Sequence, residues 1–329
     1  MSVESTPTPA PTPASSAVPI PNLHPKLAQL LELVRASGRP SFHQCSPEQA
    51  REVFAASAAA LGKGPELHRV SDLNIPTRAG SMRARLYRSG PQQTGLIVYL
   101  HGGGWCVGTI ADFDTLCRML CHDSGCAVLL LDYRLAPDHP FPAGFEDAID
   151  GIRWAWDQRK VLAGSNVPLV VAGDSAGGNL TAVTVNELAK EIPIAQQILV
   201  YPVTDCNFET ESYRHFSEGY PLSRQDMQWF FGHYASADQW IDPRISPLKS
   251  IKKHTIPPAW IGLADHDVLR DDGLRYAQAL KESGTAVELR IYPGMTHGFI
   301  RMGNLIDVAR EAVSDMARVA RESCQRAAP

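Results

Sequence analysis

The stretch VVAGDSAGGNLTAV, residues 170–183, decides the fold because it joins an apolar run to a helical pattern through a tight turn. Gly173, Ser175 and Gly177 form the pattern G-x-S-x-G, and apolar residues recur at helical spacing from Leu180 onward. Glycines on both sides of the serine leave room for strained backbone geometry. We therefore expect a strand, a sharp turn and a helix, with the Ser175 hydroxyl exposed as a nucleophile at the helix N-terminus. A glycine-rich phosphate loop is the alternative, but the spacings G-x-G-x-x-G and G-K-[ST] are absent here.

Short β-rich runs alternate with helical patterns around this junction, which is typical of a mostly parallel sheet covered by helices. No strand pattern occurs between Asp205 and Arg244, where DMQWFFGHYASADQW is helical and aromatic and indicates an insertion above the sheet. Near the N-terminus, Ser46, Pro47 and Gln49 have the spacing of a helix start with a capping box. The predicted strands are residues 82–88, 95–101, 127–132, 169–174, 198–202, 259–264 and 287–293.

The composition indicates an ordinary globular protein with four regions. The 329 residues are 44% hydrophobic, and a formal net charge of −4 makes nucleic acid a poor partner. The Pro-, Ser- and Thr-rich start has no secretion signal, and no apolar stretch reaches membrane-spanning length. Seven cysteines do not form an even disulfide framework, so we expect a cytoplasmic protein. The predicted regions are a flexible lead (1–22), N-terminal helices (23–66), a core (67–204 and 245–329) and the insertion (205–244).

A serine nucleophile needs a base, and the base needs an orienting acid. In this architecture both partners follow the serine on loops at the carboxyl ends of later strands. Among the later histidines, His297 in YPGMTHGF follows a strand and a turn, which makes it the predicted base. The stretch LADHDVLRDDG offers the acid, and spacing alone leaves Asp265 and Asp267 as alternatives. The next two acidic residues, Asp271 and Asp272, have the position of N-terminal capping charges.

The second glycine-rich stretch, HGGGW at residues 101–105, follows a predicted strand and exposes backbone amides. Such amides stabilise the negative charge that develops on a carbonyl oxygen during acyl transfer. We expect Gly103 and Gly104 to donate to that oxygen together with Ala176, and Gly102 is a third candidate. His101 is predicted to shape the loop through hydrogen bonds. The aromatic residues predicted to contact an apolar part of the substrate are Trp105, Trp229, Phe230 and Phe231.

The motifs HGGGW, DYRLAPDHPFPAGFEDA, GDSAGGNL, DVLRDDG and HGF occur in an order that resembles the hormone-sensitive-lipase-like family of α/β-hydrolase esterases, the bacterial carboxylesterase type. The resemblance covers residues from about 70 to about 320. It implies an α/β fold with an eight-stranded, mostly parallel sheet between helices, and a helical cap built from the N-terminal helices and the insertion. The family's acid begins the motif written here as DVLRDDG, so the resemblance selects Asp267.

The resemblance implies a serine carboxylesterase that hydrolyses short- to medium-chain esters through an acyl-enzyme intermediate. Ser175 attacks, His297 moves the proton and Asp267 holds the imidazole, without a metal or an organic cofactor. Cys117 and Cys121 lie one helical turn apart in an apolar helix, where packing is the expected role. The predicted partners are a small ester and, as a candidate, a second copy of the chain. The alternatives are an amidase or a lipase with the same triad, or a non-catalytic ligand-binding protein.

Overall fold

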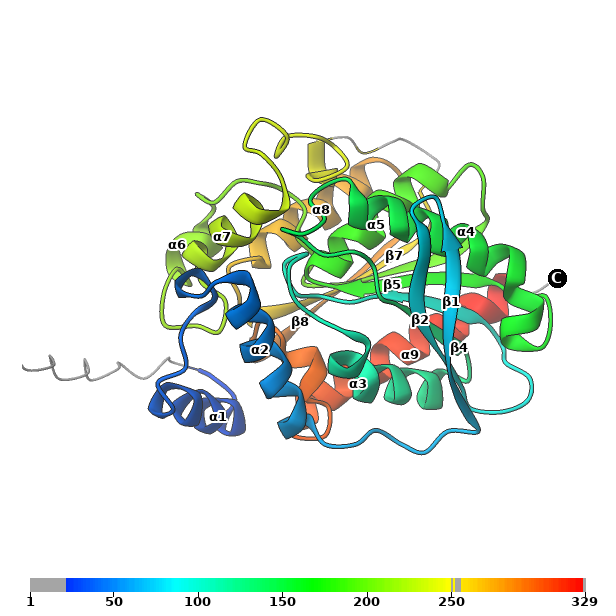
Figure 1. Cartoon of the computed structure of the whole chain (residues 1–329), viewed down its shortest axis with the longest axis horizontal. Helices are drawn as coiled ribbons and strands as arrows, with labels where there is room; N and C mark the ends of the chain where they lie inside the picture. The colour runs from blue at the N-terminus through cyan, green and yellow to red at the C-terminus, as the bar shows by residue number, and fades with distance from the viewer. Residues whose placement is uncertain (1–21, 250, 252–255, 328–329) are drawn as a thin grey trace, which may run out of the picture.

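The computed structural model describes residues 22–249, 251 and 256–327, so the predicted lead lies outside the described residues except for its last position. An eight-stranded sheet runs through the centre with the order β1-β2-β4-β3-β5-β6-β7-β8 (Figure 1). β2 pairs antiparallel with both β1 and β4. In the order β4-β3-β5-β6-β7-β8, each strand is parallel to its neighbours. The strands are β1 (Arg69–Thr77), β2 (Gly80–Arg88), β3 (Leu96–Leu100), β4 (Ala127–Leu131), β5 (Leu169–Asp174), β6 (Ile194–Val200), β7 (Ala259–His266) and β8 (Val287–Thr296).

The predicted fold class is confirmed, and the seven strands predicted from residue patterns correspond to β2 through β8. The strand without a prediction is β1, which pairs along its whole length with β2 at the edge of the sheet. Only Ile75 is buried in β1, and Pro76 follows it. An exposed edge strand does not show the continuous apolar run of a central parallel strand, which is why the pattern did not reveal it.

Helices cover both faces of the sheet (Figure 1). In β3, Ile97 and Tyr99 face the core formed with α3 (Ile110–Ser124) and α9 (Asp307–Ala327). Leu96 and Val98 face the opposite core. That second core includes residues of three helices, α4 (Ala143–Ala163), α5 (Ala176–Leu188) and α8 (Arg270–Glu282). The side chains of β3 therefore point alternately into the two apolar cores, and all of its residues are buried.

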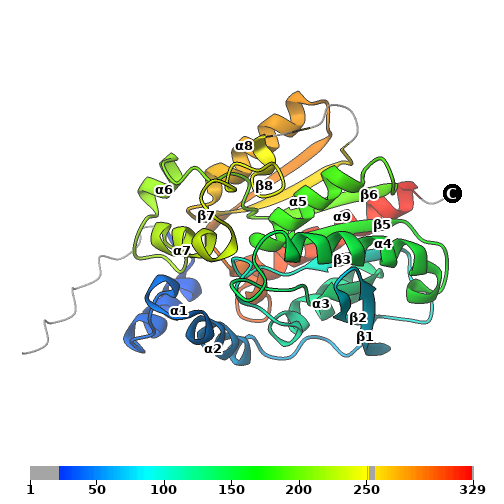
Figure 2. The same cartoon turned by 45° about the horizontal axis from the view of Figure 1, so that its top comes forward.

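The remaining helices gather beyond one end of the sheet (Figure 2). The capping box predicted at Ser46 is present, with Pro47 at the start of the helix. Between residues 205 and 244 the structure has no strand. These elements are α1 (Pro25–Ala36), η1 (Phe42–Gln44), α2 (Pro47–Ala58), η2 (Ala59–Leu61), α6 (Glu211–His215) and α7 (Arg224–Tyr234). Two further short turns are η3 (Pro247–Lys249) and η4 (Phe299–Met302).

Asp226 joins the N-terminal segment to the insertion. Its carboxylate accepts hydrogen bonds from Ser223 at the start of α7. The same carboxylate accepts the backbone N–H of His43 at 2.9 Å and contacts His43 Nδ1 at 2.8 Å. Next to this contact, the rings of Phe42 and Phe230 lie 5.2 Å apart. One buried carboxylate therefore caps α7 and fixes η1 beside it.

In the described part of the chain, none of the helices combines the length and the apolar character needed to cross a membrane.

We predict that Gly177→Ala lowers the free energy of unfolding by about 1–3 kcal/mol, because overpacking a rigid site forces its neighbours apart. A Cβ at Gly177 would lie 1.9 Å from the carbonyl oxygen of Leu100, which is backbone and cannot rotate away. Urea denaturation measures the change. Gly232→Ala on α7 is the control, because its Cβ would meet nothing within 4 Å, and helix propensity predicts a gain of up to about 1 kcal/mol. Equal stability of the two variants would contradict the prediction.

Candidate active site

Ser175 lies at the sharp turn between β5 and α5, as the sequence predicts. Its φ of 55° is in the left-handed region that side chains rarely adopt. The neighbouring glycines permit this turn, because a Cβ at Gly173 would lie 2.3 Å from the carbonyl oxygen of Gly177. The backbone N–H of Ser175 donates to the carbonyl oxygen of Val200 on β6 at 2.9 Å. The strained serine is therefore held from both sides by backbone contacts.

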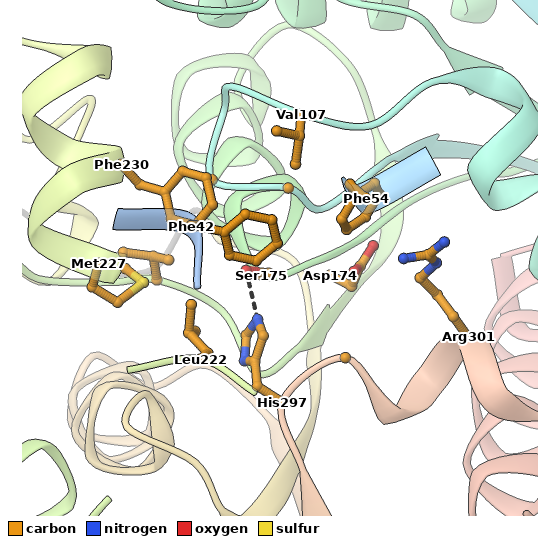
Figure 3. A pocket seen from close by; sticks show the side chains of 14 residues that line it. Phe42, Phe54, Val107, Asp174, Ser175, Leu222, Met227, Phe230, His297 and Arg301 are labelled. Carbon is orange, nitrogen blue, oxygen red and sulfur yellow. Dashed lines mark hydrogen bonds between the residues drawn. The ribbon is translucent and has the colours of Figure 1, made fainter. Parts of the chain in front are cut away.

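The imidazole of His297 reaches Ser175 from the loop that follows β8 (Figure 3). Its Nε2 lies 2.9 Å from Ser175 Oγ. Gly298 directly follows with a φ of +81°, which turns the chain immediately after the histidine. The ring of Tyr201 packs against the imidazole at a centroid distance of 4.4 Å. The predicted base is thus within hydrogen-bonding distance of the predicted nucleophile.

Asp267 contacts the other side of the same imidazole, with 2.7 Å between its Oδ2 and His297 Nδ1. Its second oxygen accepts the backbone N–H of Leu269 at 2.9 Å. A carboxylate at Nδ1 keeps the proton on that nitrogen, so Nε2 is free to accept the serine proton. Asp265 instead lies near Arg270, at 3.6 Å, with its side chain 34% exposed. Of the two acids that spacing left open, the structure brings Asp267 to the histidine.

The two capping charges predicted at the start of α8 lie in its first turn, and their carboxylates also bind other segments. Asp271 accepts the backbone N–H of Ser212 at 2.9 Å. Asp272 accepts the backbone N–H groups of Thr204 and Asp205 at 3.0 and 3.1 Å. Burial raises the pKa of Asp272 to about 8, although these two donors favour its ionised form. Both carboxylates therefore hold segments after β6 in addition to placing negative charge at the start of their own helix.

The glycine loop after β3 folds back through three consecutive left-handed residues, because Gly103, Gly104 and Trp105 have φ values of 124°, 57° and 60°. A Cβ at Gly104 would lie 2.1 Å from the ring of Phe230, so a larger residue does not fit. Within residues 22–249, 251 and 256–327, the amides of Gly103, Gly104 and Ala176 donate no hydrogen bond to protein atoms. Gly103, Gly104 and Ser175 line one cavity.

The expectation that Gly102 is a third donor is wrong. Its backbone N–H donates to Asp174 Oδ1 at 2.9 Å, and the hydroxyl of Tyr99 donates to the same oxygen at 2.9 Å. Burial raises the pKa of the Asp174 carboxyl, and these two donors oppose the shift. Asp174 thus fixes the start of the glycine loop, and the Gly102 N–H that was a candidate donor is already hydrogen-bonded to it.

His101 has the loop-shaping role predicted for it. Its Nδ1 lies 2.8 Å from the carbonyl oxygen of Gly102, so this nitrogen carries a proton and donates. The ring stacks on Tyr133 at a centroid distance of 4.4 Å, and the Tyr133 hydroxyl donates to the His101 carbonyl oxygen at 2.7 Å. Burial lowers the pKa of His101, which favours the neutral ring.

Three of the four aromatic residues predicted to contact the substrate do not line the cavity at Ser175, so these predictions are corrected. Phe230 lines the cavity, but Trp105, Trp229 and Phe231 do not. Trp105 is buried and stacks on Tyr234 at 4.3 Å, so its ring supports the loop from behind. Phe231 is fully buried and packs edge-on against Trp105. Helical spacing indicates which side chains are buried, but it does not show which of them face a cavity.

Several lining residues had no prediction from the sequence. Phe42 lies on η1 and Phe54 on α2, and their aromatic character was the available signal. The cavity contains about 490 Å³ of empty space, part of which is its open mouth. Its full lining is Phe42, Phe54, Gly103, Gly104, Val107, Asp174, Ser175, Val203, Leu222, Met227, Phe230, His297, Gly298 and Arg301.

The cysteines near these elements are packing residues. Cys117 and Cys121 are fully buried on α3, as predicted. Cys106, next to the glycine loop, is also fully buried, and burial raises the pKa of its thiol to about 12. A thiol in this state is a poor nucleophile.

Comparison with known proteins gives the family. Residues 97–301 match a family model described as alpha/beta hydrolase fold. The chain is 39% identical over 308 residues to the ethyl acetate hydrolase of Pseudomonas putida. The aligned region covers 89% of this chain and 96% of that protein. It is 43% identical over 256 residues to the carboxylic ester hydrolase LipN of Mycobacterium tuberculosis, covering 74% and 67% of the two chains. A hyperthermophilic esterase from the archaeon Pyrobaculum calidifontis superimposes with a TM-score of 0.88 and 36% identity, covering 92% and 98%.

The fold and these similarities define a member of the hydrolase class. The chain belongs to the α/β-hydrolase fold family, and within it to the hormone-sensitive-lipase-like group predicted from the sequence motifs.

We predict that Asp267→Asn lowers kcat by about 10⁴, because the amide no longer favours the required imidazole tautomer. Hydrolysis of p-nitrophenyl butyrate measures the change. Asp265→Asn is the matched control and should retain most of the activity, since its carboxylate contacts Arg270 rather than His297. The reverse order of the two variants would contradict the assignment of the acid.

Proposed function

We propose that this chain is a serine carboxylesterase that forms an acyl-enzyme on Ser175. The observation that carries the proposal is the pair of hydrogen-bond distances on one imidazole, 2.9 Å to Ser175 Oγ and 2.7 Å to Asp267 Oδ2. The printed names of the relatives, which include an ethyl acetate hydrolase and a carboxylic ester hydrolase, support the same reaction.

The mechanism follows from the two sides of the imidazole. His297 Nε2 accepts the proton of Ser175 as the oxygen attacks the ester carbonyl carbon. Asp267 stabilises the imidazolium that forms. The imidazolium then donates its proton to the leaving alkoxide, and the acyl group remains on Ser175. A water molecule, activated by the same nitrogen, attacks the acyl-enzyme and releases the acid and the free serine.

The negative charge of each tetrahedral intermediate requires fixed donors. The unpaired amides of Gly103, Gly104 and Ala176 have this role in our proposal. Ala176 begins α5, so its amide also lies at the positive end of a helix dipole. Losing one such donor typically raises the barrier by about 2.7–4 kcal/mol.

The cavity supports short- to medium-chain esters as substrates. Its wall on the α7 side is apolar and includes Phe42, Leu222, Met227 and Phe230 (Figure 3). Such a wall favours an aliphatic acyl or alcohol group through apolar burial. The triad argues against the non-catalytic alternative, and no contact in the described residues favours an amidase or a lipase. A cytoplasmic location and pairing with a second copy stay predictions.

We predict that the protein hydrolyses p-nitrophenyl butyrate and that an organophosphate labels Ser175 with a stoichiometric burst. Ser175→Ala should lose both properties, because no other group can form the acyl-enzyme. Mass spectrometry of the intact protein measures the label. Full turnover by Ser175→Ala would refute the proposed function.

We predict that Phe230→Ala shifts the preferred acyl or alcohol chain toward greater length, because the ring lines the cavity and its removal enlarges the apolar side. A series of p-nitrophenyl esters, and a series of acetate esters with longer alcohols, measure kcat/KM for both. Trp229→Ala is the control, since its half-buried ring neighbours Phe230 but does not line the cavity. The same shift in both variants would count against this role of Phe230.

A further inference from the structure

Arg301 is a buried cation that the proposed mechanism does not use. It lies on η4, four residues after His297, and lines the same cavity as Ser175. The residue is only 8% exposed. Its Nε donates to the backbone carbonyl oxygen of Asp112 at 3.3 Å. Its Nη2 is buried and has no hydrogen-bond partner among the described residues. A buried guanidinium nitrogen without a partner is costly unless another molecule satisfies it.

The guanidinium is held in place by two aromatic rings. Its central carbon lies 4.3 Å from the ring centroid of Phe54 and 5.0 Å from that of Phe113. Phe54 also lines the cavity. The contacts at Phe54, Phe113 and the Asp112 carbonyl hold the guanidinium as a fixed group of the cavity wall rather than a mobile surface group.

The cavity therefore has two unlike sides. In Figure 3, Met227 and Phe230 lie on one side of Ser175, and the Phe42 ring lies over it. Asp174 and Arg301 lie on the other side. An ester bound at Ser175 has an acyl group and an alcohol group that extend in different directions. One of these groups would meet the apolar wall, and the other would approach the Arg301 side.

The charges on the Arg301 side favour an uncharged oxygen over an anion. Asp174 and Arg301 are both buried in the cavity lining, and the hydrogen bond that Arg301 Nε donates goes to the Asp112 carbonyl oxygen. Burial lowers the pKa of Arg301, and the charges of Asp174 and Asp112 oppose this shift. Asp174 lines the cavity together with Arg301, so a substrate carboxylate bound there would meet this acidic group as well as the cation.

We propose that Arg301 determines specificity, by donating a hydrogen bond from its guanidinium group to a second, uncharged oxygen of the substrate, such as a ketone, an ether or a further ester carbonyl. This inference rests on the proposed esterase function and names the class of ester that the site prefers. The second oxygen is on the acyl or on the alcohol group, and the test separates the two sources.

The test compares matched pairs of esters. Ethyl levulinate and ethyl isocaproate differ by an oxygen in place of a methyl group on the acyl side. Methoxyethyl acetate and butyl acetate differ by an oxygen in place of a methylene on the alcohol side. The measured quantity is the ratio of kcat/KM within each pair, which does not depend on the fraction of folded enzyme. We expect the wild type to prefer the oxygenated ester in one pair, which identifies the side.

Arg301→Met should lower that ratio by about tenfold to a hundredfold, the range for a hydrogen bond to a charged group. Arg301→Lys keeps a cation and should retain part of the preference. Arg310→Met is the control, because Arg310 pairs with Asp123, neither residue lines this cavity, and the substitution should leave the ratio unchanged. If Arg301 serves packing alone, both esters of a pair lose kcat/KM equally and the ratio does not move.

Three results would overturn the inference. The first is a wild type without preference in either pair, and the second is a ratio unchanged by Arg301→Met. The third is a larger Arg301-dependent loss for monoethyl succinate than for ethyl levulinate, which would assign an anion to the subsite. A wild type that hydrolyses none of the five esters would instead refute the proposed function itself.

Discussion

The close approach of α5 to β3 is the constraint on which the site depends. A Cβ at Gly177 would lie 1.9 Å from the carbonyl oxygen of Leu100 and 2.5 Å from that of His101. The first turn of the helix therefore presses on the residues that begin the glycine loop. This contact sets Ser175 and the amide of Ala176 beside the amides of Gly103 and Gly104. Because these groups are positioned by backbone against backbone, little reorganisation is needed when negative charge develops.

Asp174 adds a second link between the same two elements. It ends β5, next to Ser175, and its carboxylate accepts the amide of Gly102 at the start of the glycine loop. The other partner of that oxygen, Tyr99, comes from β3. The neighbouring strands β3 and β5 are thus also linked by the hydrogen bonds of Asp174 at their carboxyl ends. Two neighbouring strands hold the nucleophile and the loop together, and two later strands deliver Asp267 and His297.

Sequence patterns could predict the parts of this arrangement that depend on period and order. The apolar runs revealed seven strands, and the position of His297 after a strand and a turn, downstream of the acid-bearing loop, selected it. Patterns could not resolve contacts between side chains far apart in the chain. The use of the Gly102 amide by Asp174, the stacking of Trp105 on Tyr234 and the arrival of Phe54 in the cavity all depend on tertiary packing. The edge strand β1 was missed because exposure removes its apolar run.

Asp226 caps α7 and also anchors η1, so the apolar wall near Ser175 is shared by two segments that are distant in sequence. Phe42 belongs to one segment and Phe230 to the other, while neither belongs to the sheet. The chemical step and the shape of the binding wall are consequently encoded in separate stretches of the gene. The two stretches still meet at one point, because the ring of Phe230 packs against Gly104, so a substitution in the wall is also felt at the glycine loop.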